Sequence, residues 1–158
     1  MTGKQRLHQL RQVLDSEFKR IDQVDPSELQ LRADLSRYLC VRVSGFLERA
    51  TAEVALHYCR EKADQRVGRY VKKRLANFTN PTNDRLLNLV GAFDATWRQG
   101  LEDFIGQAGR KEAIGSVVAL RHRIAHGDDV TTSYVQVSEY YAKVAEVVEF
   151  LAGVFDPV

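Results

Sequence analysis

The chain of 158 residues, with 44% apolar and 28% charged side chains, has the size and composition of one globular domain. Its net charge of +2 is too small to indicate nucleic-acid binding by itself, and no apolar run approaches the ~18 residues of a membrane-spanning helix. The charged N-terminal stretch does not resemble a signal peptide, so we expect a cytoplasmic protein with a single domain over residues 1–158.

Apolar residues recur at intervals of three and four along most of the chain, a pattern that predicts amphipathic helices and no strands. A first helix is predicted over residues 4–24. A long second helix is predicted over residues 26–62, because Asp25–Pro26 is a typical helix start. A third helix is predicted over residues 65–78. The residues expected on its inner face are Val67, Tyr70, Val71 and Leu75.

The second half of the chain continues the helical pattern after a turn-forming cluster at residues 79–83. A fourth helix is predicted from Asn83 onward, with Gly100 as an interruption. A fifth ends near His126 with Gly127 as its C-cap, and a last helix follows a cap at Ser133. The predicted fold is therefore an all-α antiparallel bundle of about five to six helices.

Charge is distributed unevenly along the sequence. Residues 60–74 contain seven Lys or Arg against two acids, whereas residues 128–158 contain six acids against one Lys. Arg66, Arg69 and Lys73 share a helical face, and we predict that they contact an RNA backbone. The alternative is a solvated face that pairs with the acidic final helix.

The two cysteines, Cys40 and Cys59, fall inside helical patterns without the spacing of a zinc site or a disulfide. We expect both to be small buried apolar residues. No cofactor motif is present, and no metal site or cofactor is expected.

The most unusual segment is LRHRIAHGDD, residues 120–129, where an apolar helix ends in two arginines and two histidines. One interpretation is that Arg121, Arg123 and His126 are cations that cap a helix C-terminus, with His122 incidental. The other is an active site, because imidazole exchanges protons near neutral pH and a guanidinium binds phosphate oxygens.

The segment from Arg121 to His126 resembles the signature of the HEPN superfamily, an Arg, a polar residue and a short spacer that ends in His (Rx4H). The following Gly127, the acidic loop and the tyrosine-rich final helix are also similar to that superfamily. So is the long second helix with Ser44 and Glu48 one turn apart. The resemblance covers the whole chain, most closely its last third, and is closest to the RiboL-PSP-HEPN type.

This resemblance implies a metal-independent endoribonuclease of prokaryotic defence or a toxin–antitoxin system. Catalytic members of the superfamily are usually homodimers. The further partner implied by the resemblance is a cognate antitoxin or another protein of the defence system. The RNA product would carry a 2′,3′-cyclic phosphate. The implied roles are proton transfer by His126, phosphate stabilisation by Arg121, and support by His122, Glu48 and Ser44. Arg123 lies inside the spacer, where the signature requires no particular residue, and we predict that it contacts an RNA phosphate. In one branch a Tyr often stands two residues after the His, where this chain has Asp128.

Two other functions remain open at this stage. The first is a non-catalytic HEPN module that binds RNA, a nucleotide or a partner protein, expected if Arg121 or His126 is buried in a capping role. The second is a plain helical dimerisation module, expected if the basic face of residues 60–74 pairs with acids.

Overall fold

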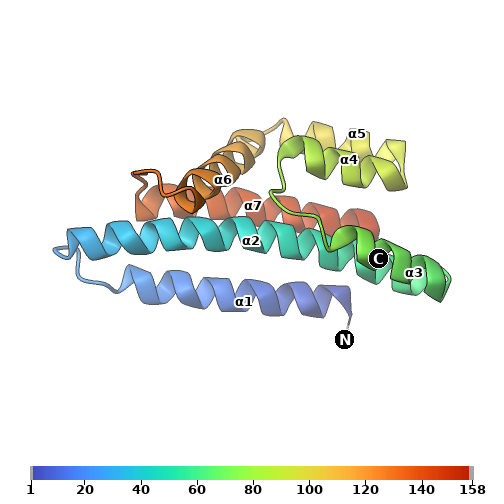
Figure 1. The fold of residues 1–158 in the computed structure, drawn as a ribbon, viewed down its shortest axis with the longest axis horizontal. Coiled ribbons are helices and arrows are strands. Elements are labelled where there is room, and N and C mark those ends of the chain that lie inside the picture. Colours follow the sequence, from blue (N-terminus) through green and yellow to red (C-terminus); the bar gives the residue numbers. More distant parts are fainter. Residues whose placement is uncertain (1, 157–158) are drawn as a thin grey trace.

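A computed structural model describes residues 2–156, which form seven α-helices and no strand (Figure 1). The helices are α1 (Gly3–Asp22), α2 (Leu29–Lys62), α3 (Gln65–Leu75), α4 (Asn83–Phe93), α5 (Ala95–Ile105), α6 (Arg110–Ala125) and α7 (Tyr134–Phe155). The all-α prediction is confirmed. The expected number of helices is too small, because the predicted fourth helix divides into α4 and α5.

The division occurs at Asp94, not at Gly100 as expected. The backbone of Asp94 is extended (φ −162°), and its carboxylate accepts hydrogen bonds from the backbone N–H groups of Thr96 at 2.7 Å and Trp97 at 3.0 Å. An aspartate that satisfies these free N–H groups is a strong helix start. Asp94 is therefore the residue of the sequence that indicates the start of α5, and Gly100 lies inside that helix.

The long helix α2 is the axis of the bundle. It extends along most of the molecule, with α1 on one side and α6 and α7 on the other (Figure 1). Its buried side chains cover several faces because α1, α3, α6 and α7 all contact it. The buried hydroxyls of Ser36 and Thr51 each donate to the carbonyl four residues earlier, at 2.7 Å, so these small side chains need no partner on another helix.

Four aromatic rings hold the α4–α5 hairpin against α2 and α7. Phe155 of α7 meets Phe93 of α4 and Trp97 of α5 at centroid distances of 5.1 and 5.3 Å, and Tyr58 of α2 meets all three rings at 5.5 to 5.8 Å. All these pairs are edge-to-face, an arrangement that adds about 0.5–1.5 kcal/mol per pair beyond burial. The cluster thereby fixes the direction in which α6 leaves the hairpin.

Several predicted helix bounds are displaced. α2 begins at Leu29, because Asp25 instead accepts a hydrogen bond from the N–H of Ser27 in a separate turn, at 2.9 Å. α3 ends at Leu75, three residues earlier than expected. The predicted inner face of α3 is wrong in part, since Leu75 is buried but Val67 and Tyr70 are 49% and 60% exposed.

The prediction for the cysteines is confirmed. Cys40 is fully buried and Cys59 is 4% exposed, and both are free thiols. Burial raises the pKa of Cys40 to about 11, so its thiol stays protonated at neutral pH. Across residues 2–156, no helix has the length and apolar character needed to cross a bilayer.

Candidate functional site

The motif lies at the C-terminal end of α6, where a glycine stops the helix. Gly127 adopts a left-handed backbone (φ 77°), its N–H donates to the carbonyl of Ile124 at 3.1 Å, and the N–H of Asp128 donates to that of Arg123 at 3.0 Å. These two bonds are the Schellman pattern, which satisfies carbonyls that the helix leaves free. The predicted C-cap role of Gly127 is confirmed, and His126 is held at the last helical turn.

The loop that follows the motif is anchored to the bundle. Val130 is 2% exposed, and its carbonyl accepts a hydrogen bond from Nη1 of Arg37 on α2 at 3.4 Å. Ser133 caps α7 by accepting from the N–H of Gln136 at 3.1 Å, as predicted. The Gln136 side chain does not return to the backbone of Ser133, and instead accepts a hydrogen bond from the hydroxyl of Thr132 at 3.2 Å.

The guanidinium of Arg121 does not cap its own helix. Its Nη1 donates to the side-chain Oδ1 of Asn80 at 2.6 Å, across to the connection between α3 and α4. Asn80 has a left-handed backbone (φ 49°), which asparagine tolerates better than most residues, and the turn is also held by a hydrogen bond from Arg85 to the carbonyl of Thr79. Arg121 is half-buried, and its other guanidinium N–H groups form no further hydrogen bond or ion pair within residues 2–156.

Asn80 is a site residue that sequence reasoning missed. The cluster Thr79-Asn80-Pro81-Thr82-Asn83 predicts a turn, and a turn is what the structure shows. Nothing in the sequence indicates that this turn lies beside a helix 41 residues later. An asparagine within a turn is a signal for left-handed backbone, but its side-chain partner depends on the tertiary fold.

The two histidines of the motif lie ring to ring. The ring centroids of His122 and His126 are 4.3 Å apart with an interplanar angle of 63°, and both side chains are exposed. Their four-residue spacing predicts this shared face. No interaction joins His126 to Arg121 among residues 2–156, and no third His, Cys, Asp or Glu there completes a metal-binding group.

Arg123 joins the end of α6 to the loop that follows it. Its Nε lies 3.8 Å from a carboxylate oxygen of Asp128, and its Nη2 donates to the carbonyl of Asp129 at 3.5 Å. It also borders a small hollow of about 270 Å³ between α6 and α7. Both partners lie beyond the end of α6, so these contacts hold the acidic loop and do not satisfy the carbonyls of the helix.

The two supporting residues expected on α2, Ser44 and Glu48, differ in burial. Ser44 is 1% exposed and belongs to the core of the described protomer. Glu48 is half-buried and forms no ion pair with another residue in the range 2–156. Neither residue contacts the motif through a hydrogen bond or ion pair in that range.

The expected RNA-binding residues Arg66, Arg69 and Lys73 are all exposed on α3. Helix α3 packs against the last turns of α2 near Cys59, whereas the loop after the motif contacts α2 at Arg37. At 1.5 Å per residue, these two points of α2 are roughly 33 Å apart. The C-terminal end of α3 lies closer to the motif, because only residues 76–79 separate it from Asn80, which binds Arg121. No hydrogen bond or ion pair joins Arg66, Arg69 or Lys73 to the motif within residues 2–156.

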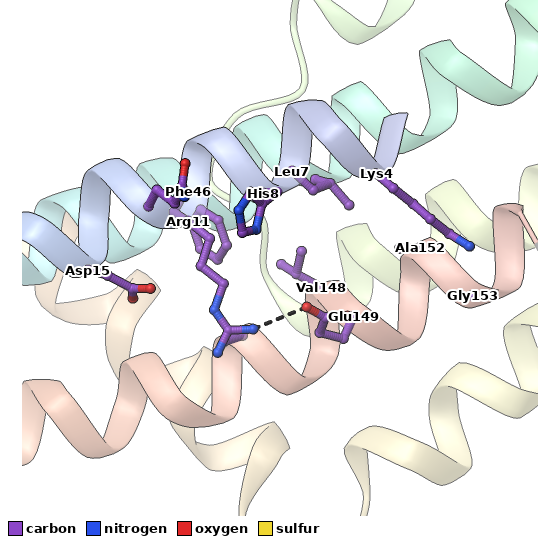
Figure 2. Close-up of a pocket in the computed structure, with 12 residues that line it drawn as sticks. Lys4, Leu7, His8, Arg11, Asp15, Phe46, Val148, Glu149, Ala152 and Gly153 are labelled. Atoms are coloured by element: carbon purple, nitrogen blue, oxygen red, sulfur yellow. Dashed lines mark hydrogen bonds and ion pairs between the residues drawn. The ribbon is translucent and has the colours of Figure 1, made fainter. Parts of the chain in front are cut away.

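A second hollow of about 610 Å³ lies between α1 and α7, away from α6 (Figure 2). The guanidinium of Arg11 reaches Glu149 at 3.1 Å in this hollow, and Asp15 accepts a hydrogen bond from the hydroxyl of Tyr141 at 2.6 Å. Burial, and then this bond to Asp15, raise the pKa of Tyr141, so its hydroxyl remains a donor. These polar contacts join α1 to α7.

The chain matches a known protein family. The sequence profile of the RiboL-PSP-HEPN family matches residues 6–156, nearly the whole chain, and the matched range includes Arg121 and His126. The same comparison with curated proteins and with solved structures gives no match.

The left-handed stop at Gly127 predicts opposite effects for two Gly→Ala substitutions. An added Cβ would meet no atom within 4 Å at Gly127 or at Gly45, which lies inside α2. We expect Gly127→Ala to lower the free energy of unfolding by about 1–2 kcal/mol, because only its backbone conformation opposes a side chain. Gly45→Ala should raise it by about 0.5–1 kcal/mol. Urea unfolding measures both, and equal effects of the two substitutions would contradict the assignment.

Proposed function

The chain belongs to the RiboL-PSP-HEPN family, and we propose that it is a metal-independent endoribonuclease whose reaction is carried by Arg121 and His126. The observation that carries this proposal is the bond from Arg121 to Asn80. A capping arginine needs only the carbonyls of its own helix, whereas this guanidinium is held by Asn80 of another segment. The same helix end carries the two exposed imidazoles of His122 and His126. A phosphate-binding arginine requires such positioning.

The chemistry is the attack of a ribose 2′-oxygen on the adjacent phosphorus. A bond forms between that oxygen and phosphorus, the bond from phosphorus to the 5′-oxygen breaks, and the products are a 2′,3′-cyclic phosphate and a 5′-hydroxyl. His126 either takes the proton of the 2′-hydroxyl or gives one to the departing 5′-oxygen. Arg121 donates to the phosphate oxygens, where negative charge increases in the transition state. His122, against the ring of His126, orients that imidazole.

A complete site requires two protomers in this proposal. One chain offers one Arg121 and one His126, and these two side chains do not contact each other in the described protomer. The motif lies on an exposed helix end, so a second copy can approach it. A homodimer with facing motifs would combine Arg121 of one copy with His126 of the other, and would thereby form two composite sites.

The biological setting is proposed on the same family basis. A free endoribonuclease in the cytoplasm requires restraint, which prokaryotic defence and toxin–antitoxin systems provide through a trigger or an antitoxin protein. The alternative function is a non-catalytic HEPN module that binds RNA, a nucleotide or a partner protein. The observation that favours it is the position of His126 at the helix C-cap, where its backbone N–H is used within the helix.

Cleavage of labelled mixed-sequence RNA in EDTA tests the proposal. We expect wild-type protein to leave 2′,3′-cyclic phosphate ends, and both His126→Ala and Arg121→Ala to reduce the rate about 100-fold or more. His8→Ala and Arg49→Ala are matched controls, since both residues are exposed and lie outside the motif. Folded wild-type protein that binds this RNA without cutting it would establish the non-catalytic alternative.

The hydrogen bond to Arg121 predicts a specific effect of Asn80→Gly. Glycine accepts the left-handed backbone of this position without strain, so the melting temperature should change little while the guanidinium loses its acceptor. We expect kcat to fall about 10- to 100-fold with a smaller change in KM, because the misplaced group acts mainly in the transition state. Unchanged kcat would show that Arg121 does not depend on Asn80.

Mixing two inactive variants tests whether the site is shared between copies. Arg121→Ala and His126→Ala proteins, unfolded and refolded together in equal amounts, form mixed dimers in which one composite site is intact. Random pairing with independent sites should restore about a quarter of the wild-type rate. A mixture that remains as inactive as each variant alone would place the whole site within one protomer.

A further inference from the structure

The outer face of α3 presents an exposed aromatic ring among cations. Tyr70 is 60% exposed, and the guanidinium carbon of Arg74 lies 5.7 Å from the centroid of its ring. Arg66 and Lys73 lie one turn away from Tyr70 on the same face, and Arg69 is adjacent to Lys73 on it. These five residues, all exposed, form what we call the α3 stripe.

The cations of the α3 stripe are not neutralised by the acids of the described chain. No side chain of Arg66, Arg69, Lys73 or Arg74 forms a hydrogen bond or ion pair within residues 2–156. The alternative prediction was that this basic face pairs with the acidic final helix, and no such ion pair forms within residues 2–156. The acids of α7 are instead engaged with other helices, Glu146 with Arg110 at 2.8 Å and Glu149 with Arg11 at 3.1 Å.

A hollow of about 650 Å³ beside the stripe extends this positive surface. Arg60 and Lys72 line it, together with Arg66 and Arg69 of the stripe, between α3 and the end of α2. The one acid there, Asp64, is used as the N-cap of α3 and accepts a hydrogen bond from the N–H of Arg66 at 2.9 Å. The surface therefore favours a polyanion over an acidic or neutral ligand of a few atoms.

We propose that the α3 stripe binds single-stranded RNA at a site separate from Arg121 and His126. One base stacks on the Tyr70 ring, and the phosphates on either side contact Arg66, Arg69 and Lys73. The cations alone would suit any polyanion, but an exposed ring at their centre is suited to an unpaired base. A duplex keeps its bases stacked on one another and cannot use the ring. The inference rests on the proposed function only in taking RNA as the ligand.

Binding of a non-cleavable strand tests this site independently of catalysis. The probe is a fluorescein-labelled 2′-O-methyl RNA single strand of about ten nucleotides, measured by anisotropy in EDTA with the full chain. It has no free 2′-hydroxyl to attack phosphorus, so binding can be measured whether or not the chain is a nuclease. We expect Tyr70→Ala to bind about 5- to 100-fold more weakly with an unchanged salt dependence. Tyr70→Phe, which keeps the ring, should bind as the wild type does.

A charge variant provides the complementary result. Arg66→Gln, Arg69→Gln and Lys73→Gln combined should reduce the slope of log Kd against log salt by about two, because each phosphate contact on a single strand contributes about 0.7. Tyr38→Ala and Arg49→Gln are the matched controls. Tyr38 is 47% exposed on α2, Arg49 is exposed on the same helix, and both should leave affinity unchanged.

Three results would overturn the proposal. The first is equal binding of the single strand by wild type and Tyr70→Ala. The second is equally tight binding of the corresponding duplex, which would make the stripe a general polyanion surface. The third is a change in oligomeric state of the triple variant, by sedimentation, with no change in RNA affinity, which would make the stripe a protein contact. Failure of the cleavage experiment alone would leave this proposal standing.

Discussion

The length of α2 is the constraint on which the arrangement of the molecule depends. Its 34 residues span about 50 Å, and α1, α3, α6 and α7 all pack directly against it. A helix buried on several faces cannot be read as a simple two-sided amphipathic helix, and its apolar residues accordingly extend around much of its circumference. The loop after α6 contacts α2 at Arg37, near its beginning, and α3 packs near its end at Cys59, so α2 connects these two segments of the fold.

The motif is built from two segments that are distant in the sequence. The Schellman bonds at Gly127 fix the position of His126, and they depend only on local sequence. The orientation of Arg121 depends on Asn80, which the α3–α4 connection brings beside α6. The aromatic cluster around Phe155 contributes to this placement, because it fixes the α4–α5 hairpin from which α6 departs. The histidine is therefore positioned locally, whereas the arginine is positioned by the tertiary fold.

The same distinction explains how much could be predicted. Helical periodicity, Gly127, the cap at Ser133 and the histidine pair depend on neighbours within four residues, and each is confirmed by the structure. The bond between Asn80 and Arg121 could not be predicted, and the burial predicted for Tyr70 is wrong, because both features depend on packing between helices. Tyr70 fits an apolar stripe in the sequence, but among the described helices α3 contacts only α2, so most of the predicted inner face beyond Leu75 has little to pack against. The break at Asp94 depends only on neighbouring residues, so the sequence does indicate it. The prediction of a break at Gly100 is wrong because a capping aspartate starts a helix more strongly than a glycine interrupts one.

The basic residues of the chain fall into two groups, which the small net charge does not reveal. Arg11, Arg42 and Arg110 pair with acids and join helices, whereas the cations of the α3 stripe pair with none in the described chain. If both proposals hold, a bound RNA strand is what connects the two sites. The stripe would then affect how long RNA stays on the protein, and Arg121 and His126 would determine how fast it is cut.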